Sequence, residues 1–223
     1  VANSSLDNSD TINGGNDTDT LTITDAATIV DADFTNINGI EILELADATN
    51  SVSLGSTAGN KGNLTITGGT GNDTLNLNDF DSASITLTAN SSGTTSGSVT
   101  GGGGTDSFTG LESIVGSSGS DTLTDGITAD NTLTLTGANQ GSLDDFQFSG
   151  IENVDLAAGN DTVEFTSGDS VSGTLTGGDG TADQLDYSSY GSSINVDLAA
   201  GSATATGTIS GFEQVVGSSQ DDT

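Results

Sequence analysis

The chain has 223 residues and a formal net charge of −31, since 32 acidic residues accompany a single basic one, Lys61. Such an anionic surface repels nucleic-acid phosphates and anionic lipids, so we expect neither nucleic acid nor a membrane as a partner. There is no Cys, so disulfides are excluded, and no apolar run approaches the ~20 residues that cross a bilayer.

Short runs in which apolar residues alternate with Thr or Asn predict strands with one buried face. The runs, in chain order, are residues 21–23, 64–66, 75–77, 85–87, 133–135 and 194–196. Clusters of Gly, Asn, Asp and Ser between them predict turns. We therefore expect an all-β fold; a β-sandwich and a disordered acidic chain are the alternatives.

A glycine–aspartate turn recurs between the predicted strands. Its copies, complete or partial, cover residues 14–21, 68–75, 101–108, 116–123, 157–163, 177–183 and 217–223. Stacked carboxylates on strands about 4.8 Å apart repel by roughly 1 kcal/mol per pair in water and about 3 kcal/mol at a dielectric constant of 20. The chain has one cationic side chain to offset this repulsion, so we expect bound cations.

A second, longer unit runs from Gly, an apolar residue and Glu to an Asp eleven residues after the Gly. The pairs of Glu and Asp are Glu112 with Asp121, Glu152 with Asp161 and Glu213 with Asp222. A fourth copy has Glu41, and Asn50 replaces the aspartate in it, so we interpret this copy as degenerate. These glutamates could complete a metal site, but we favour outward, solvated positions.

The glycine–aspartate turns resemble the calcium-binding nonapeptide GGxGxDxUx of repeats-in-toxin, or haemolysin-type, proteins. Residues 68–75 and 101–108 match each specified position, and the other copies are partial. The resemblance implies a parallel β-roll that binds Ca²⁺ between stacked turns. The implied ligands are Asp19, Gly68, Thr70, Asp73, Gly101, Gly103, Asp106, Gly116, Ser118, Asp121, Asp161, Gly177, Asp179, Asp183 and Asp222. Alternatively, each aspartate caps its own turn.

The nonapeptides are not in tandem, unlike those of the family. We therefore expect one parallel β-helix or β-roll-like solenoid with wider, irregular coils over residues 1–223, as a segment of a longer protein. The longer units also resemble those of large bacterial surface and S-layer-like proteins. Seven Phe residues are expected in the core, and Tyr187 with Tyr190 in a structural stack or, alternatively, a sugar platform.

We predict a calcium-stabilised structural or adhesive module of a secreted or cell-surface bacterial protein. Calcium, and identical subunits or extracellular glycans, are the expected partners. A self-assembling S-layer or filament subunit is the alternative. A polysaccharide-modifying enzyme is disfavoured because His is absent and Lys61 is the only basic residue. An ice-binding module is disfavoured because the exposed residues mix Thr with Asn, Asp and Ser.

Overall fold

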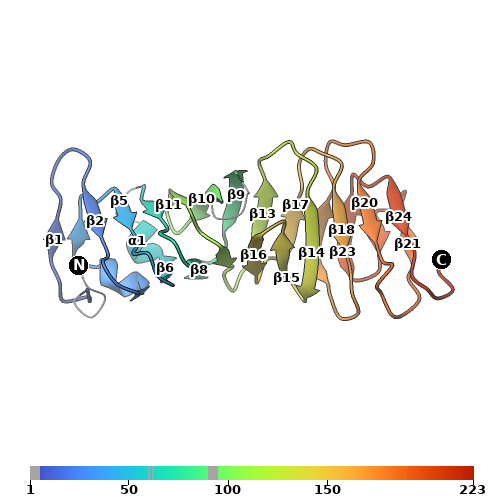
Figure 1. The fold of residues 1–223 in the computed structure, drawn as a ribbon, viewed down its shortest axis with the longest axis horizontal. Coiled ribbons are helices and arrows are strands. Elements are labelled where there is room, and N and C mark those ends of the chain that lie inside the picture. Colours follow the sequence, from blue (N-terminus) through green and yellow to red (C-terminus); the bar gives the residue numbers. More distant parts are fainter. Residues whose placement is uncertain (1–5, 60, 62, 90–94) are drawn as a thin grey trace. The chain divides into compact units, whose positions relative to one another are not determined.

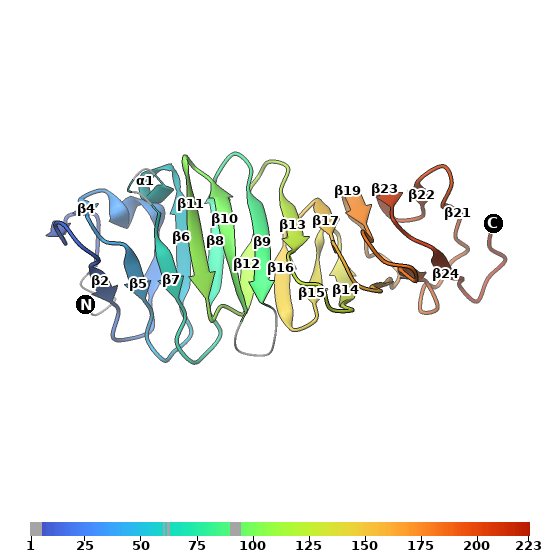
Figure 2. The ribbon, with the colours of Figure 1, turned by 90° about the horizontal axis from the view of Figure 1, so that it is seen from above.

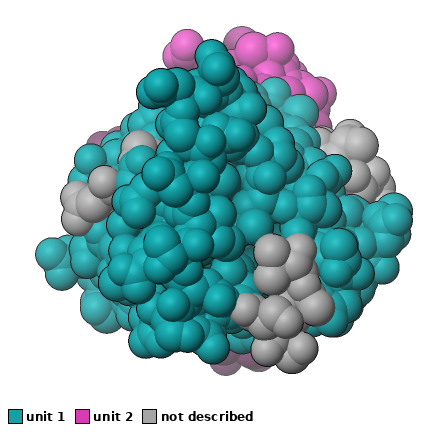
Figure 3. Space-filling model, turned by 90° about the vertical axis from the view of Figure 1, so that its left-hand side faces the viewer, with its two compact units in different colours: residues 1–120 teal, residues 121–223 magenta. Residues whose placement is uncertain are grey.

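Short strands joined by tight turns make up most of this computed structural model, which describes residues 6–59, 61, 63–89 and 95–223. Two single helical turns interrupt them, η2 (Asp31–Phe34) and α1 (Ser56–Gly59). The expected all-β class is confirmed. The chain forms two compact units, residues 1–120 and residues 121–223, which Figure 3 colours separately. That residues 1–223 form one domain stays a prediction.

In unit 1 the chain enters two sheets in alternation (Figures 1 and 2). Its first sheet contains, in spatial order, β2 (Thr20–Thr22), β5 (Ile42–Glu44), β7 (Thr65–Thr67), β11 (Gly104–Thr109), β10 (Ser96–Gly101) and β9 (Ser84–Ala89). Its second sheet contains β3 (Thr28–Ile29), β6 (Ser51–Gly55), β8 (Thr74–Asp79) and β12 (Ser113–Val115). A separate parallel pair joins β1 (Ile12–Asn13) to β4 (Ile37–Asn38).

Unit 2 repeats this arrangement of two sheets. Its first sheet contains β13 (Thr122–Asp125), β17 (Asn153–Asp155), β19 (Val171–Thr176) and β23 (Thr206–Ser210). Its second sheet contains β16 (Phe146–Ser149), β15 (Gln140–Leu143), β14 (Thr132–Gly137), β18 (Thr162–Glu164), β20 (Gln184–Asp186) and β24 (Gln214–Val216). A short antiparallel pair joins β21 (Val196–Asp197) to β22 (Ser202–Ala203).

The parallel register aligns inward-facing apolar side chains in rows, one for each sheet of each unit. The rows in unit 1 are Leu21, Leu43, Ile66 and Phe108, and Ile29, Val52, Leu75 and Ile114. Those in unit 2 are Leu123, Val154, Leu175 and Ile209, and Leu133, Val163, Leu185 and Val215. All of these side chains are buried except Val215. All seven Phe residues are buried too, so the core role expected for the Phe residues is confirmed.

Antiparallel hairpins interrupt the parallel pattern. β9, β10 and β11 form one set, and β14, β15 and β16 form another. Gly101 pairs with Gly104 across the turn between β10 and β11, where Gly102 has φ 58° and Gly103 has φ 109°. Glycine suits this two-residue turn because both central residues need positive φ. The expected long parallel sheets are confirmed, and the antiparallel hairpins inserted in them, which the sequence did not predict, account for the irregular repeat length. That the coils form a solenoid stays a prediction.

Candidate metal site

An Asp, Asn or Glu precedes many strands, and its side-chain oxygen accepts a hydrogen bond from the equivalent backbone N–H of the preceding repeat. In unit 1, Asn50 N donates to Asp73 Oδ1 at 3.0 Å, and Asp73 N donates to Glu112 Oε2 at 2.7 Å. We call Asn50, Asp73 and Glu112 the unit 1 ladder. Each bond pairs a backbone N–H at the start of a strand, which burial would otherwise leave unsatisfied.

Unit 2 contains a ladder with the same hydrogen bonding. Asn131 N donates to Asp161 Oδ1 at 2.7 Å, and Asp161 N donates to Asp183 Oδ1 at 2.7 Å. Asp183 N in turn donates to Glu213 Oε2 at 3.0 Å. We call these four residues the unit 2 ladder. Repeats without an insert are 22 or 23 residues long, as between Asp161 and Asp183 or between Asn50 and Asp73.

The four glutamates of the longer sequence unit share one role. Each accepts a backbone N–H from an aspartate of the preceding repeat, in the pairs Asp19–Glu41, Asp73–Glu112, Asp121–Glu152 and Asp183–Glu213. Three of these glutamates are half-buried and Glu213 is exposed, so an outward position agrees with the structure, but the sequence did not predict the hydrogen bonds that they accept. They fix the register between repeats, because only the aligned register brings each carboxylate to an N–H.

Replacing Glu112 by Ala is expected to destabilise the protein by about 1–3 kcal/mol, because Asp73 N–H would lose its acceptor in a part-buried place. Glu112→Gln keeps an acceptor oxygen and should recover most of the loss. The matched control is Glu44→Ala, since Glu44 accepts an exposed hydroxyl from Thr22. Urea unfolding midpoints check this, and equal effects of Glu112→Ala and Glu44→Ala would contradict it.

Each ladder lies beside a pair of closely stacked turns. A Cβ on Gly69 would lie 2.4 Å from Ala46 O, and one on Gly71 would lie 2.4 Å from Ala48 O. In unit 2, a Cβ on Gly178 would lie 2.1 Å from Ala157 O, and one on Gly180 would lie 2.3 Å from Gly159 O. The glycines are thus required for close backbone approach. We define the unit 1 corner as Ala46, Ala48, Asn50, Gly69, Gly71 and Asp73, and the unit 2 corner as Ala157, Gly159, Asp161, Gly178, Gly180 and Asp183.

The polar atoms of the unit 1 corner satisfy one another. Asn50 Nδ2 donates to Ala46 O at 3.0 Å, to Ala48 O at 2.8 Å and to Asp73 Oδ1 at 2.7 Å. Gly69 N donates to the other oxygen of that carboxylate, Asp73 Oδ2, at 3.1 Å. The Asn50 amide therefore lies among three oxygens that would otherwise face one another.

The unit 2 corner has no such amide. Asp161 and Asp183 are fully buried, yet neither Asp161 Oδ2 nor Asp183 Oδ2 has a hydrogen-bond partner among the described residues. Burial, reinforced by the negative charge of Asp183, raises the pKa of Asp161 to about 6. Burial, with the charge of Glu213 added, also raises the pKa of Asp183. Two buried carboxylates with free oxygens are a favourable place for a cation.

The remaining predicted ligands lie in several different places. Gly101 and Gly103 belong to the hairpin turn, and Asp106 points inward from β11, where Asp106 Oδ1 accepts Leu64 N at 2.8 Å. Burial raises the pKa of Asp106. Asp121 is buried and pairs with Glu152. Asp222 is exposed, and the N–H of Ile194 lowers its pKa.

The other predicted positions lie in turns. Asp19 Oδ2 is buried without a hydrogen-bond partner in the described part of the chain. The backbone N–H of Thr70 donates to Asp47 Oδ1 at 2.9 Å, and that of Asp179 donates to Ala157 O at 2.6 Å. The rest are Gly68 and Gly177, which follow strands, and Gly116 and Ser118, which lie in the turn after β12. The structure thus brings Asp161 together with Asp183, and the metal role of every predicted position stays a prediction.

Sequence reasoning missed the two amides. Asn50 was interpreted as a decayed ligand and Asn131 was not considered, although both stand where an aspartate would complete the repeat. Asn131 Nδ2 donates to Ala129 O at 3.0 Å and also bonds Asp125 Oδ2. Their spacing in the sequence could have identified them. Asn50 lies 23 residues before Asp73, and Asn131 lies 30 residues before Asp161.

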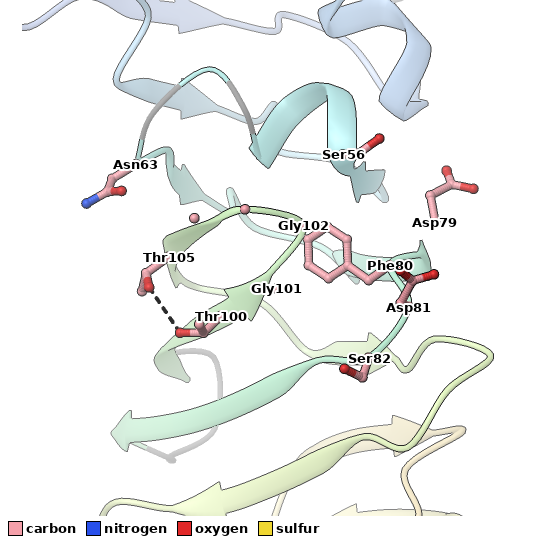
Figure 4. A pocket seen from close by; sticks show the side chains of 12 residues that line it. Ser56, Asn63, Asp79, Phe80, Asp81, Ser82, Thr100, Gly101, Gly102 and Thr105 are labelled. Carbon is pink, nitrogen blue, oxygen red and sulfur yellow. Dashed lines mark hydrogen bonds between the residues drawn. The ribbon is translucent and has the colours of Figure 1, made fainter.

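A cleft of about 880 Å³ opens in unit 1 beside the glycine hairpin (Figure 4). It is lined by Ser56, Asn63, Asp79, Phe80, Asp81, Ser82, Thr100, Gly101–Gly104 and Thr105. The Phe80 ring packs against the turn, because a Cβ on Gly102 would lie 2.5 Å from the ring. These lining residues offer carboxylates and hydroxyls but no cationic side chain.

The aromatic residues near the C-terminal repeats stack internally. Phe165 and Tyr187 are stacked with ring centroids 4.4 Å apart, and Tyr190 meets Tyr187 edge-on at 5.6 Å. Tyr187 is fully buried, and its hydroxyl donates to Thr204 O at 2.7 Å. The expected structural stack is confirmed for Tyr187.

No protein-family model matches the chain, and no curated protein matches it. Within residues 6–59, 61, 63–89 and 95–223, no three His, Cys, Asp or Glu side chains are grouped so as to hold a metal by themselves. Among the same residues, no helix is long and apolar enough to cross a membrane. The resemblance to calcium-binding nonapeptides therefore depends on the turn motifs alone.

Proposed function

We propose that this chain is a calcium-stabilised β-solenoid module with a structural or adhesive role at a bacterial surface or outside the cell. The alternation of strands between two sheets supports the solenoid. The observation that carries the metal proposal is the pair of buried oxygens, Asp161 Oδ2 and Asp183 Oδ2, which lack hydrogen-bond partners among the described residues.

The unit 2 corner suits a hard cation. Calcium takes six to eight oxygen ligands from carboxylates, backbone carbonyls and water. Asp161 and Asp183 would supply carboxylate oxygens, and the carbonyls of Ala157 and Gly159 belong to the turn that Gly178 and Gly180 pack against. A divalent ion would neutralise both buried charges, which the chain cannot do itself because it has one basic residue.

The mechanism is the coupling of metal binding to folding. Without calcium, repulsion among carboxylates opposes the stacking of repeats in a chain of net charge −31. At extracellular calcium concentrations of about 10⁻³ M, binding to the folded state shifts the equilibrium toward the stacked repeats. A stack of repeats then serves as a stiff spacer or scaffold.

A scaffold role agrees better with the side chains than catalysis does. Lys61, the one basic residue, bonds Thr35 O at 2.8 Å and Asn38 Oδ1 at 3.3 Å with its ammonium group. It does not line the cleft beside the glycine hairpin. Charge stabilisation in a reaction would therefore have to come from carboxylates and hydroxyls, which suit few transition states.

Calcium is expected to raise the melting temperature by about 5–10 °C relative to chelator. This follows because saturation at 100 times Kd contributes about 2.7 kcal/mol, and 1 kcal/mol shifts a chain of this size by about 2–4 °C. Circular dichroism in calcium and in chelator would measure it, with magnesium at equal ionic strength as the control. An unchanged melting temperature, or an equal rise with magnesium, would contradict the proposal.

A further inference from the structure

The two corners share one ladder hydrogen bond and the close approach of glycines to the preceding turn, and they differ in the side chain that follows that turn, which is Asn50 in one and Asp161 in the other. Asn50 N donates to Asp73 Oδ1, and Asp161 N donates to Asp183 Oδ1 in the same way. Each is followed by a turn whose glycines pack on the carbonyls two and four residues before it. Asn50 in unit 1 and Asp161 in unit 2 are therefore equivalent positions.

The difference between them is an NH₂ group in one unit and an oxygen in the other. In unit 1 the amide nitrogen of Asn50 donates to Ala46 O, Ala48 O and Asp73 Oδ1 within 3.0 Å. In unit 2 the equivalent oxygens are those of Ala157, Gly159 and Asp183. Asp161 has a second oxygen, Oδ2, in place of the amide nitrogen of Asn50, and this oxygen is buried without a hydrogen-bond partner in the described chain.

We infer that the Asn50 amide takes the place of a cation in the unit 1 corner, so that the unit 2 corner depends on calcium and the unit 1 corner does not. The inference rests on the proposed function, since it assigns the metal to one of two equivalent corners. Its basis is donor chemistry: an amide supplies two N–H donors to surrounding oxygens, whereas a carboxylate supplies none unless it is protonated.

The unit 2 ladder itself contains both kinds of side chain, an amide in one repeat and a carboxylate in the next. Asn131, the member before Asp161, uses its Nδ2 to bond Ala129 O at 3.0 Å and also Asp125 Oδ2. The carbonyl of Ala129, two residues before Asn131, corresponds to that of Ala48 before Asn50. Calcium is therefore assigned to the place between Asp161 and Asp183, where two successive members of the ladder are carboxylates. It is not assigned to the place between Asn131 and Asp161, where the first member is an amide.

The test exchanges the two residues in the full chain, as Asp161→Asn and Asn50→Asp. Hydrogen exchange followed by mass spectrometry would compare peptides of β6 and β18 in calcium and in chelator. In the unchanged chain, calcium at 100 times Kd should slow exchange in β18 by up to about 100-fold where opening releases the ion, and leave β6 unchanged. Asp161→Asn should protect β18 equally with and without calcium, and Asn50→Asp should make β6 calcium-dependent.

The outcomes separate this inference from the proposed function. Equal calcium protection of β6 and β18 in the unchanged chain would overturn the inference and leave the calcium-stabilised module standing. No calcium response anywhere in the unchanged chain would overturn the proposed function, whatever the variants do. Even if Asn50→Asp does not fold in chelator, it must regain protection of β6 in calcium. If it does not, or if Asp161→Asn keeps its calcium response, the inference is overturned.

Discussion

Gly68→Ala is expected to destabilise unit 1 by about 3 kcal/mol or more, equally in calcium and in chelator. A Cβ at this position would lie 1.8 Å from the backbone oxygen of Gly110. A backbone oxygen cannot rotate away as the end of a side chain can. Gly68 N is also held at 2.8 Å from Thr109 O, so the strand cannot move aside without losing a hydrogen bond. Overpacking against backbone exceeds the usual cost of an added methyl group. Urea unfolding in both buffers measures the effect.

Gly191→Ala is the matched control. The added Cβ would meet only a side-chain hydroxyl, Ser167 Oγ, at 2.9 Å. That hydroxyl can rotate away at the cost of one exposed hydrogen bond, which it accepts from Gly191 N at 2.8 Å. Its expected cost is below about 1 kcal/mol. If Gly68→Ala were no more harmful than this control, the close stacking of the turns would be refuted. If calcium abolished its cost, Gly68 would act through the metal and not through packing.

The strands and their buried faces were predictable because their signal is local. Alternation of Thr with Leu, Ile or Val has the period of a strand, and Leu21, Ile66 and Leu75 are buried as expected. The recurrence of Gly, an apolar residue and Glu also identified real equivalents. Ile114 and Val154, which both stand four residues after the Gly, lie in apolar rows.

The partners of the acidic residues were not predictable, because they come from another repeat. Glu112 meets Asp73 from 39 residues away, since a hairpin is inserted between them. Nothing next to Glu112 in sequence indicates that distance. The tetraglycine 101–104 is ambiguous for a related reason: glycine permits both a metal-binding turn and a two-residue hairpin, and cross-strand pairing selects the hairpin.

Hydrogen bonding separates two kinds of acidic side chain in this fold. Glu112 and Glu152 accept backbone N–H groups that stacking would otherwise leave unpaired, and this use needs no metal. Asp161 and Asp183 each accept one such N–H and retain a second buried oxygen without a partner among the described residues. The surplus oxygen, and not the number of acidic residues, is the feature that favours a cation.

In chelator, stability is expected to fall as the pH rises from about 4 to about 6, and then to level off. Burial raises the pKa of Asp125 to about 6, and it also raises the pKa of Asp161 to about 6. Below pH 4 both carboxyls are protonated in the folded and unfolded states. Between pH 4 and 6 the unfolded chain releases these protons more readily, so ionisation favours unfolding. Above about pH 7 both states are ionised and the difference stays constant.

Asp125→Asn removes one of the two titrating groups, and its amide oxygen can still accept a hydrogen bond from Asn131 Nδ2. The hydrogen bond from Ile127 N, 3.2 Å from Asp125 Oδ1, is lost at every pH and therefore adds no pH dependence. The variant should lose part of the pH dependence. Between pH 4 and pH 7 its stability should fall by about 1–3 kcal/mol less than that of the unchanged chain, since one pKa unit corresponds to about 1.4 kcal/mol. Asp81→Asn, at an exposed position, should follow the unchanged chain. Urea midpoints at pH 4, 5, 6 and 7 measure this, and a stability that rises with pH in chelator would show that these carboxyls are not held in a desolvated place.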